Sequence, residues 1–267
     1  MDDRAELSEA RPAVLLEDIS HRFTAPDGVS MAVLDDVSLT LREREFFTLV
    51  GPSGCGKSTL LNMMSGLLKP TKGTIRLLGE GRALTRRDIG YITQDSNLYP
   101  WATVLENVLV PLQIRKLNKH EARDRAQQWI KLVGLDGFEH HYPKQLSGGM
   151  QKRCSIARTM VYEPDLLLMD EPFGALDAIT RATLQNTILE LWQQRQTSVM
   201  FITHDLTEAI TLADRVAVMS ARPGRIRAVV DVGLARPRDV HNIAAAPRFR
   251  LLRQDLWHLL EPELEAH

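Results

Sequence analysis

The sequence lacks several features that would assign it to common protein classes. Only two of its 267 residues are cysteines, Cys55 and Cys154, and they form neither a disulfide framework nor the spacing of a metal site. No apolar run approaches the ~20 residues that a membrane-spanning helix needs. The net charge is −1, which argues against broad, sequence-independent binding of nucleic acid. We therefore expect free thiols in a reducing cytosol, and contact with a membrane only through a partner.

The length and the first residues of the chain indicate its domain number and whether a secretory signal is expected. A chain of 267 residues buries roughly three quarters of its unfolded surface, so we expect one large domain or a domain with a subdomain. Residues 1–6 are polar and acidic, so no secretory signal is predicted. The rest of the chain alternates short apolar runs with amphipathic stretches, which is typical of an α/β fold.

Residues 51–58 carry the pattern G-x-x-x-x-G-K-S, which is built to hold nucleotide phosphates. Glycines let the backbone approach the ligand, successive N–H groups point at the phosphates, Lys57 supplies a cation and Ser58 can ligate Mg²⁺. An ordinary glycine-rich turn is a weaker explanation, because a chance match has odds on the order of a percent. The residues expected to contact nucleotide here are Gly51, Pro52, Ser53, Gly54, Cys55, Gly56, Lys57, Ser58 and Thr59.

Periodicity predicts the elements around this loop. A strand over 46–50 precedes it, and a helix over 58–68 follows with Leu67 and Leu68 on its buried face. A helical region is predicted from 104 to about 133. The other predicted strands are 74–78, 89–93, 166–169, 198–203, 216–219 and 226–232, and the other predicted helices are 179–195, 206–213 and 249–260.

Asp170 and Glu171 directly follow the apolar run at 166–169. In phosphate-loop nucleotidases, a carboxylate at such a strand end holds Mg²⁺ directly or through water, which predicts that role for Asp170. Glu171 is placed to polarise an attacking water as general base. Strand-end acids are also common without a function, but the phosphate loop upstream favours the catalytic interpretation.

A second glycine-containing turn, Leu-Ser-Gly-Gly-Met at 146–150, opens another helix. Ser147 is the expected N-cap, and the N–H groups beside Gly148 and Gly149 form a further anion site. For this motif alone, a capped helix start without a ligand is an equal alternative. Two phosphate-binding helix starts in one chain would be unusual unless both bind the same nucleotide.

These motifs, in this order, resemble the ATP-binding subunits of ABC transporters from about residue 14 to 232. The turn at 146–150 corresponds to the family signature, with Met150 where glutamine is common. Residues 169–181 and 220–226 look most like the nitrate, sulfonate and taurine importers. The resemblance implies an α/β P-loop NTPase core of RecA-like type, with an antiparallel β subdomain and an inserted α-helical subdomain.

The resemblance also implies a domain division. The ABC-type ATP-binding domain would span 14–235, with the helical subdomain inserted at about 98–160. Residues 236–267 would form a short C-terminal helical extension. Arginines make this extension locally basic, which indicates a solvated face or, alternatively, contact with anionic lipid headgroups. They are Arg236, Arg238, Arg248, Arg250 and Arg253.

Four further roles come from the resemblance. Gln94 fits the glutamine that senses Mg²⁺ and the attacking water, and His204 fits the histidine that contacts the γ-phosphate. Phe23 fits the aromatic that stacks on adenine, with a core phenylalanine as the rival interpretation. Asp177, in the sequence G-A-L-D, fits a loop that contacts the other subunit's nucleotide site. The catalytic residues would be Lys57, Glu171 and His204, and the Mg²⁺ ligands would be Ser58, Gln94 and Asp170.

The implied function is ATP hydrolysis by an importer subunit that dimerises around two ATP–Mg²⁺, with a second copy or a paralogous ATPase subunit. A separate integral-membrane permease and, indirectly, a solute-binding protein are the other implied partners, at the cytoplasmic face of the inner membrane. Residues 98–107 would meet a permease helix, unless Trp101 is simply buried. Nucleic acid is not an expected partner. The alternative is a non-transport ABC-type ATPase that acts on nucleic acid or on a protein complex.

Overall fold

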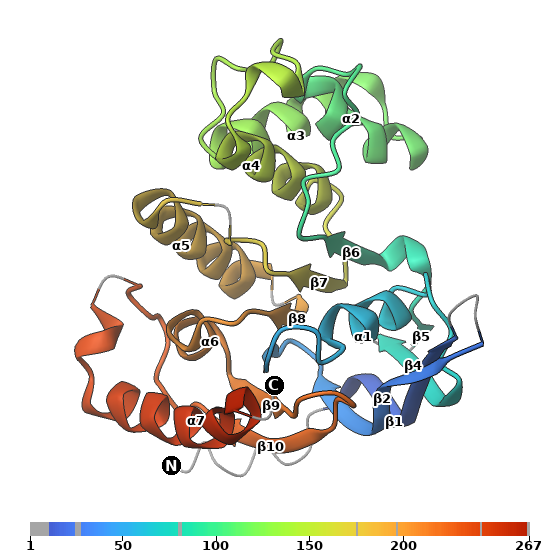
Figure 1. Ribbon diagram of the computed structural model, residues 1–267. Coiled ribbons are helices and arrows are strands. Elements are labelled where there is room, and N and C mark those ends of the chain that lie inside the picture. The colour runs from blue at the N-terminus through green and yellow to red at the C-terminus, as the bar shows by residue number, and fades with distance from the viewer. Residues whose placement is uncertain are drawn as a thin grey trace.

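The computed structural model describes residues 11–24, 28–79, 82–174, 176–195, 197–240 and 242–265. Two sheets organise these residues: a six-stranded sheet with the order β10-β9-β3-β8-β7-β6, and a four-stranded sheet with the order β2-β1-β4-β5 (Figure 1). Residues 1–6, on which the expectation of no secretory signal depends, and Ala175 of the G-A-L-D sequence lie outside the described residues.

The six-stranded sheet is parallel except at one edge, where β10 runs antiparallel to β9. The strands β3, β7 and β8 are buried along their whole length. Parallel strands covered on both faces require such continuous apolar runs, which is why the sequence predicted them closely. The strands are β3 (Phe46–Val50), β6 (Ile89–Ile92), β7 (Leu166–Asp170), β8 (Ser198–Ile202), β9 (Arg215–Met219) and β10 (Ile226–Asp231).

Alternation of side chains along β3 divides the core into two clusters. Phe46 and Val50 point to the cluster that includes the helices α5 (Ala178–Arg195), α6 (Leu206–Leu212) and α7 (Pro247–Glu265). Phe47 and Leu49 point to the opposite face, where α1 (Lys57–Met64) and the four-stranded sheet pack. The phosphate loop therefore leaves the sheet between two buried layers.

The four-stranded sheet is antiparallel throughout and contains β1 (Pro12–Thr24), β2 (Ser30–Arg42), β4 (Lys72–Gly79) and β5 (Arg82–Ala83). Periodicity predicted only β4 among them. Register shifts interrupt the β1–β2 ladder, and Asp18 and Asp36 have positive φ values of 54° and 55°. Such bulges break the period-2 pattern by which a half-buried strand is recognised.

The helix after the phosphate loop is shorter than predicted. It ends at Met64, and Gly66 follows with a φ of 74°. A left-handed glycine at this place stops the helix. Leu67 is 70% exposed, so its assignment to a buried helical face is wrong.

A group of three helices lies at the top of Figure 1, away from the four-stranded sheet. It consists of α2 (Val104–Ile114), α3 (Lys119–Leu132) and α4 (Gly148–Met160), so the single helical region predicted over 104–133 is two helices. Thr103 and Glu106 form a capping box that starts α2, and Asn118 caps α3. The proposed division of the chain at 98–160 and at 235 remains a prediction.

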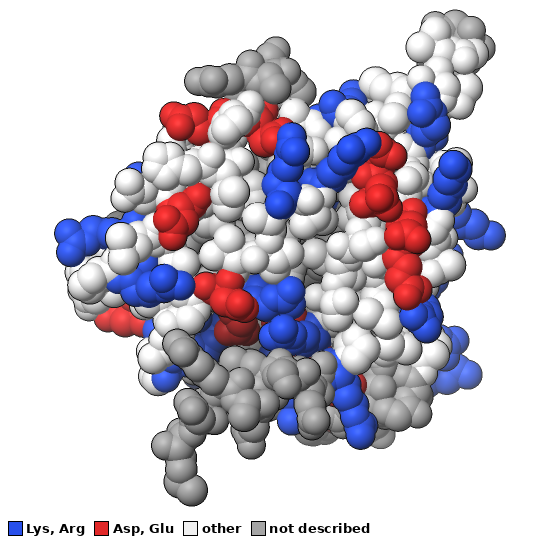
Figure 2. Space-filling model, turned by 90° about the horizontal axis from the view of Figure 1, so that it is seen from below, with Lys and Arg blue, Asp and Glu red and all other residues white. Residues whose placement is uncertain are grey.

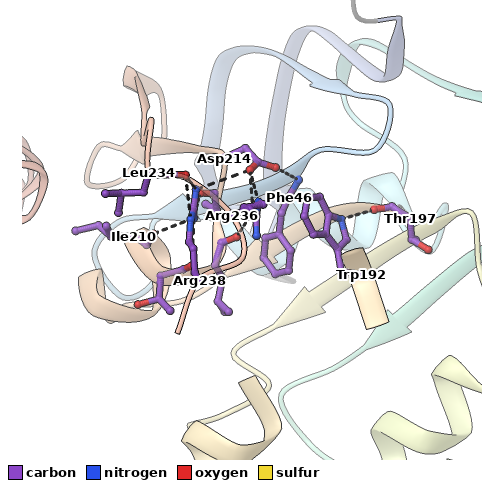
Figure 3. A network of polar contacts seen from close by, with 11 residues as sticks. Phe46, Trp192, Thr197, Ile210, Asp214, Leu234, Arg236 and Arg238 are labelled. Atoms are coloured by element: carbon purple, nitrogen blue, oxygen red, sulfur yellow. Dashed lines mark hydrogen bonds and ion pairs between the residues drawn. The ribbon is translucent and has the colours of Figure 1, made fainter. Parts of the chain in front are cut away.

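The C-terminal segment is tied to the core by a polar network (Figure 3). Arg238 is buried and donates to carbonyl groups at the C-terminal end of α6. Arg236 donates to Asp214 and lies over the ring of Trp192, 4.1 Å from its centroid, while Asp214 also accepts from the Phe46 N–H. Burial lowers the pKa of Arg238 to about 10, so the side chain is still charged at neutral pH.

These contacts correct one expectation. Arg238 is buried, and Arg236 is partly buried between Asp214 and the Trp192 ring, so neither a solvated face nor a lipid surface accounts for them. The exposed arginines of α7 fit a solvated face. Figure 2 shows basic and acidic side chains beside one another on the lower face of the molecule. Within the described part of the chain, no helix is both long and apolar enough to span a bilayer.

Candidate nucleotide-binding site

The phosphate loop connects β3 to α1, and two of its glycines are required by close packing. A Cβ added at Gly51 would lie 2.9 Å from the carbonyl oxygen of Met219. Gly56 has a φ of 105°, and a Cβ there would lie 2.7 Å from Leu34 Cδ2. Only glycine accommodates both constraints without moving the backbone.

Lys57 is buried inside the loop that it follows. Its Nζ donates to the carbonyl oxygens of Gly51, at 2.8 Å, and Pro52, at 2.7 Å. At the next residue, the Ser58 side chain lies near the carboxylate of Asp170 at the end of β7. Burial raises the pKa of Asp170, an effect that the nearby Ser58 hydroxyl opposes. The loop thus brings a cation, a hydroxyl and a carboxylate together.

Glu171 and His204 form the second part of the site. The Glu171 Oε2 lies 3.1 Å from His204 Nδ1, and the two residues follow β7 and β8. Glu171 has a φ of 44°, a left-handed conformation that costs a non-glycine residue about 1–3 kcal/mol. Its N–H donates to the Ile202 carbonyl at 3.0 Å, which holds the backbone in this conformation. Strain of this kind is typical of functional sites.

A cavity of about 550 Å³ joins these residues. It opens at the carboxyl ends of the parallel strands, where ligands bind in open α/β sheets. Its described lining residues are Phe23, Met31, Val33, Ser53, Gly54, Gly56, Lys57, Ser58, Thr59, Gln94, Glu171, His204 and Arg222. A larger cavity, of about 690 Å³, lies at the opposite ends of the strands beside Arg44 and Ser198. None of the predicted catalytic residues lines it.

Phe23 and Gln94 both face the first cavity. Phe23 is 45% exposed and packs edge-on against His21 at 4.7 Å, so the rival interpretation of a core phenylalanine is wrong. The exposed Gln94 follows β6, and its carbonyl accepts from Lys152 Nζ at 2.9 Å. Stacking of Phe23 on adenine and a metal-sensing role for Gln94 remain predictions.

The 147–149 turn does not join this cavity. Ser147 caps α4 by accepting from the Met150 N–H at 3.2 Å. A Cβ added at Gly148 would meet nothing within 4 Å. Asp177 is also exposed, and its Oδ1 accepts from the Thr180 N–H at 3.0 Å at the start of α5. These predicted nucleotide contacts are thus not among the described residues that line the cavity at the chain's own phosphate loop.

Sequence reasoning missed two cations near the site. Lys152 of α4 is 2% exposed and also donates to the Thr93 carbonyl. Burial lowers the pKa of Lys152 to about 8. Its spacing of four residues before Ile156 places it on the buried helix face, a signal that could have identified it. Arg222 lines the cavity from a loop far along the chain, and no local pattern indicates that contact.

The loop before α2 was expected either to meet a permease helix or to bury Trp101, and the structure excludes the second. Trp101 is 75% exposed, so the interpretation of a buried tryptophan is wrong. Its ring lies 5.6 Å from that of Tyr99, which is also exposed. Buried Asn107 holds the loop, because its side chain accepts from the Tyr99 N–H and donates to the Ala102 carbonyl. The aromatic pair is thus presented to solvent on a fixed backbone.

The donor set fits Mg²⁺ bound together with a nucleotide. Mg²⁺ is usually held by one or two carboxylates and hydroxyls plus substrate phosphates, rather than by an all-protein cage. Ser58 and Asp170 supply oxygen ligands that lie near each other. In the described ranges, no group of three or more His, Cys, Asp or Glu residues could hold a metal without such a substrate.

Comparison with known proteins gives sequence relatives over most of the chain. A family model described as ABC transporter matches residues 34–174. An uncharacterised ABC transporter ATP-binding protein of Methanocaldococcus jannaschii is 46% identical over 238 residues, which cover 89% of this chain and 88% of that protein. An aliphatic sulfonates import ATP-binding protein of Bacillus thuringiensis is 42% identical over 226 residues, covering 85% and 88%.

Solved structures are similar as well. The dimeric structure of a bacterial ABC transporter cassette matches with a TM-score of 0.75 and 32% identity, covering 83% of this chain and all of that one. A dimeric post-hydrolysis state of the same cassette, bound to ADP and Pi, gives the same values.

Proposed function

This chain belongs to the ABC transporter family as an ATP-binding protein with ATPase activity, and we propose that two copies close around two ATP molecules. Each ATP would lie between the phosphate loop of one copy and the 147–149 turn of the other. The observation that carries this proposal is the exposed helix start at Ser147, whose open space lies outside the chain's own nucleotide cavity. The dimeric form of the two similar cassette structures supports it.

Within each site, the residues of one copy would prepare hydrolysis. Lys57 and the loop N–H groups neutralise charge that develops on the phosphates. Glu171 accepts a proton from the attacking water, and His204 holds the carboxylate in place through their 3.1 Å contact. Bound Mg²⁺, held by Ser58 and Asp170 with Gln94 nearby, would neutralise phosphate charge.

The energy of closure would move a separate membrane permease. Exposed Tyr99 and Trp101, fixed by Asn107 at the edge of the helical group, would form the contact with a permease helix. The name of the Bacillus relative supports import of aliphatic sulfonates or similar anions, captured by a solute-binding protein. The chain would then act as a peripheral protein on the cytoplasmic face of the inner membrane.

Complementation between two inactive variants tests the shared site. Lys57→Ala removes the phosphate-loop cation but keeps the 147–149 turn, whereas Ser147→Arg fills that turn and keeps the phosphate loop. We expect each variant alone to lose most ATP hydrolysis. A mixture contains heterodimers with one intact composite site, so hydrolysis should return when the two are combined.

Two controls make the result decisive. Adding either variant to itself at the same total concentration should give no recovery, and cross-linking should show whether the mixed dimer forms. If the mixed dimer forms and hydrolysis does not return, the phosphate loop and the 147–149 turn do not act across two copies.

A further inference from the structure

The phosphate loop is held at Gly54 by a turn from a distant part of the chain. We propose that Arg222 is a positioning residue that keeps the loop in its phosphate-accepting shape, and that Glu263 of the C-terminal helix α7 supports it. The inference rests on the proposed function in so far as ATP is the ligand. It assigns to α7 a role in nucleotide binding, although α7 does not line the cavity.

Arg222 hydrogen-bonds one peptide group of the loop through two of its nitrogens. Its Nε and Nη2 both donate to the Gly54 carbonyl, at 3.1 and 2.8 Å. In a trans peptide the C=O and N–H bonds point in opposite directions. Holding the Gly54 carbonyl against Arg222 therefore turns the Cys55 N–H away from Arg222 and fixes the direction in which this N–H is offered to a phosphate. A free peptide could rotate and present its carbonyl to the phosphate instead.

The turn that carries Arg222 abuts the loop at the next peptide as well. A Cβ added at Gly224 would collide with the Cys55 carbonyl. The Gly224 N–H donates to the Val33 carbonyl at 2.9 Å, and its own carbonyl accepts from the Asp35 N–H at 3.1 Å. The turn is thus fixed between the phosphate loop and β2, so Arg222 extends from a rigid base.

The C-terminal helix supplies the remaining support. Glu263 is 8% exposed, and its Oε2 accepts from the Ala221 N–H at 2.8 Å, one residue before Arg222. Its Oε1 accepts from Arg227 Nε at 2.6 Å on the other side of the turn. Hydrogen bonds to a carboxylate are stronger than neutral ones, particularly when water is excluded. Glu263 therefore holds both sides of the turn that holds the loop.

A second role for Arg222 has to be separated from this one. Its Nη1 lies 3.0 Å from the Met31 sulfur, and both residues line the cavity with Phe23. Arg222 could therefore touch the base or the ribose directly. If Arg222 acts by such a contact, its loss weakens binding only of ligands that contain a nucleoside. If Arg222 shapes the loop, its loss weakens binding of any polyphosphate.

Binding of ATP and of inorganic tripolyphosphate distinguishes the two roles. We expect Arg222→Ala to weaken both ligands by the same factor, about five- to tenfold, because hydrogen bonds from a charged group to an exposed carbonyl are lost. Arg222→Lys keeps the charge but not the two-nitrogen contact, so its loss should be intermediate. The KM for ATP should rise while kcat stays within about twofold.

Glu263→Ala tests the support from α7. We expect about a threefold loss in ATP affinity, and a double variant with Arg222→Ala that binds no more weakly than Arg222→Ala alone, because both changes act through one contact. Arg248→Ala, which removes an exposed arginine from the same helix, is the matched control and should bind normally.

Three results would overturn the inference: unchanged affinity in Arg222→Ala, weakened ATP with unchanged tripolyphosphate, or additive losses in the double variant. Failure of the unmodified chain to bind ATP would contradict the proposed function instead. The tripolyphosphate comparison would still decide the role of Arg222 in that case.

Discussion

The chain contains two glycine-rich helix starts, and they differ in what surrounds them. At α1, the loop encloses Lys57, Ser58 lies near Asp170, and Glu171 and His204 line the same cavity. At α4, Ser147 caps the helix and the space beside Gly148 is open. Both offer backbone N–H groups to an anion. A helix start becomes a catalytic site only where a cation, metal ligands and a base are placed around it.

The largest expected effect comes from the base at the first helix start. Glu171→Gln retains the shape of the side chain but removes its capacity to accept a proton. We expect single-turnover hydrolysis to fall by about 10²–10⁴-fold. ATP affinity, measured by equilibrium binding, should change by less than about twofold, and the ATP-bound dimer should accumulate because it is no longer consumed.

Another carboxylate, that of Glu208, provides the control. Glu208 is buried, accepts from the Thr203 hydroxyl at 2.6 Å and does not line the nucleotide cavity. Glu208→Gln should therefore keep hydrolysis within about threefold. Equal losses in the two variants, or normal turnover by Glu171→Gln, would show that Glu171 is not the base.

A substitution at the second helix start should reduce activity without reducing stability. Gly148 begins α4, and a methyl group there meets nothing within 4 Å, so Gly148→Ala is accommodated by the chain itself. We expect the free energy of unfolding to stay unchanged or rise by up to about 1 kcal/mol. Hydrolysis should nevertheless fall by about tenfold or more, since the methyl group occupies the space proposed for the partner's phosphate.

Urea unfolding and steady-state hydrolysis of the same preparation check this prediction, and ATP binding at low protein concentration should remain normal. If Gly148→Ala is fully active in both assays, the open space at Gly148 does not receive a nucleotide. A loss of stability parallel to the loss of activity would contradict the prediction as well, because the substitution would then act through the fold of α4.

The first helix start could be predicted from the sequence much better than what packs around it. Strands β3 and β7 are covered on both faces, so each is one continuous apolar run, and the phosphate loop and Asp170 follow them directly. Strands β1 and β2 are bulged, so their alternation is broken and only the family resemblance indicated them. The predicted roles of these residues in binding and catalysis are still to be tested.

Contacts between distant segments account for most of what the sequence did not reveal. Arg222 reaches Gly54 across 168 positions, and Glu263 reaches Ala221 across 42. Arg238 was interpreted from local charge as a surface residue, but the carbonyl groups at the end of α6 make its burial possible. Such partners are set by the fold, and no local period encodes them.

Lys152 connects the two helix starts. Replacing it should reduce hydrolysis less than the changes at Glu171 and Gly148. It lies in α4, five positions after Ser147, while its Nζ donates to the Thr93 and Gln94 carbonyls beside the first cavity. Lys152→Met keeps a side chain of similar length but leaves both carbonyls without this donor. We expect a loss of about 1–2 kcal/mol in the free energy of unfolding, measured with urea.

Hydrolysis by Lys152→Met should fall by more than ATP affinity, because Gln94 loses its fixed position. Exposed Lys144, just before the same helix, gives the control: Lys144→Met should alter stability by less than about 0.5 kcal/mol. If the two variants behave alike, the buried ammonium does not couple α4 to the residues that follow β6.

The smallest expected change concerns the two thiols, one in the phosphate loop before α1 and one in the middle of α4. Cys55 lies in the phosphate loop and Cys154 in α4, and both are fully buried. Burial raises the pKa of both, that of Cys154 to about 12. Since the thiolate is the reactive form, both should react with a thiol reagent at pH 8 far more slowly in the native chain than in urea.

Single-thiol variants, Cys154→Ala and Cys55→Ala, report separately on the phosphate loop and on α4. At a low protein concentration that keeps the chain monomeric, ATP should slow labelling of Cys55, because a bound ligand disfavours opening of the loop that contains it. Labelling of Cys154 should not change, since the helix start at α4 would meet nucleotide only in the dimer. Equal protection of both thiols under these conditions would mean that one copy engages ATP with both of its helix starts.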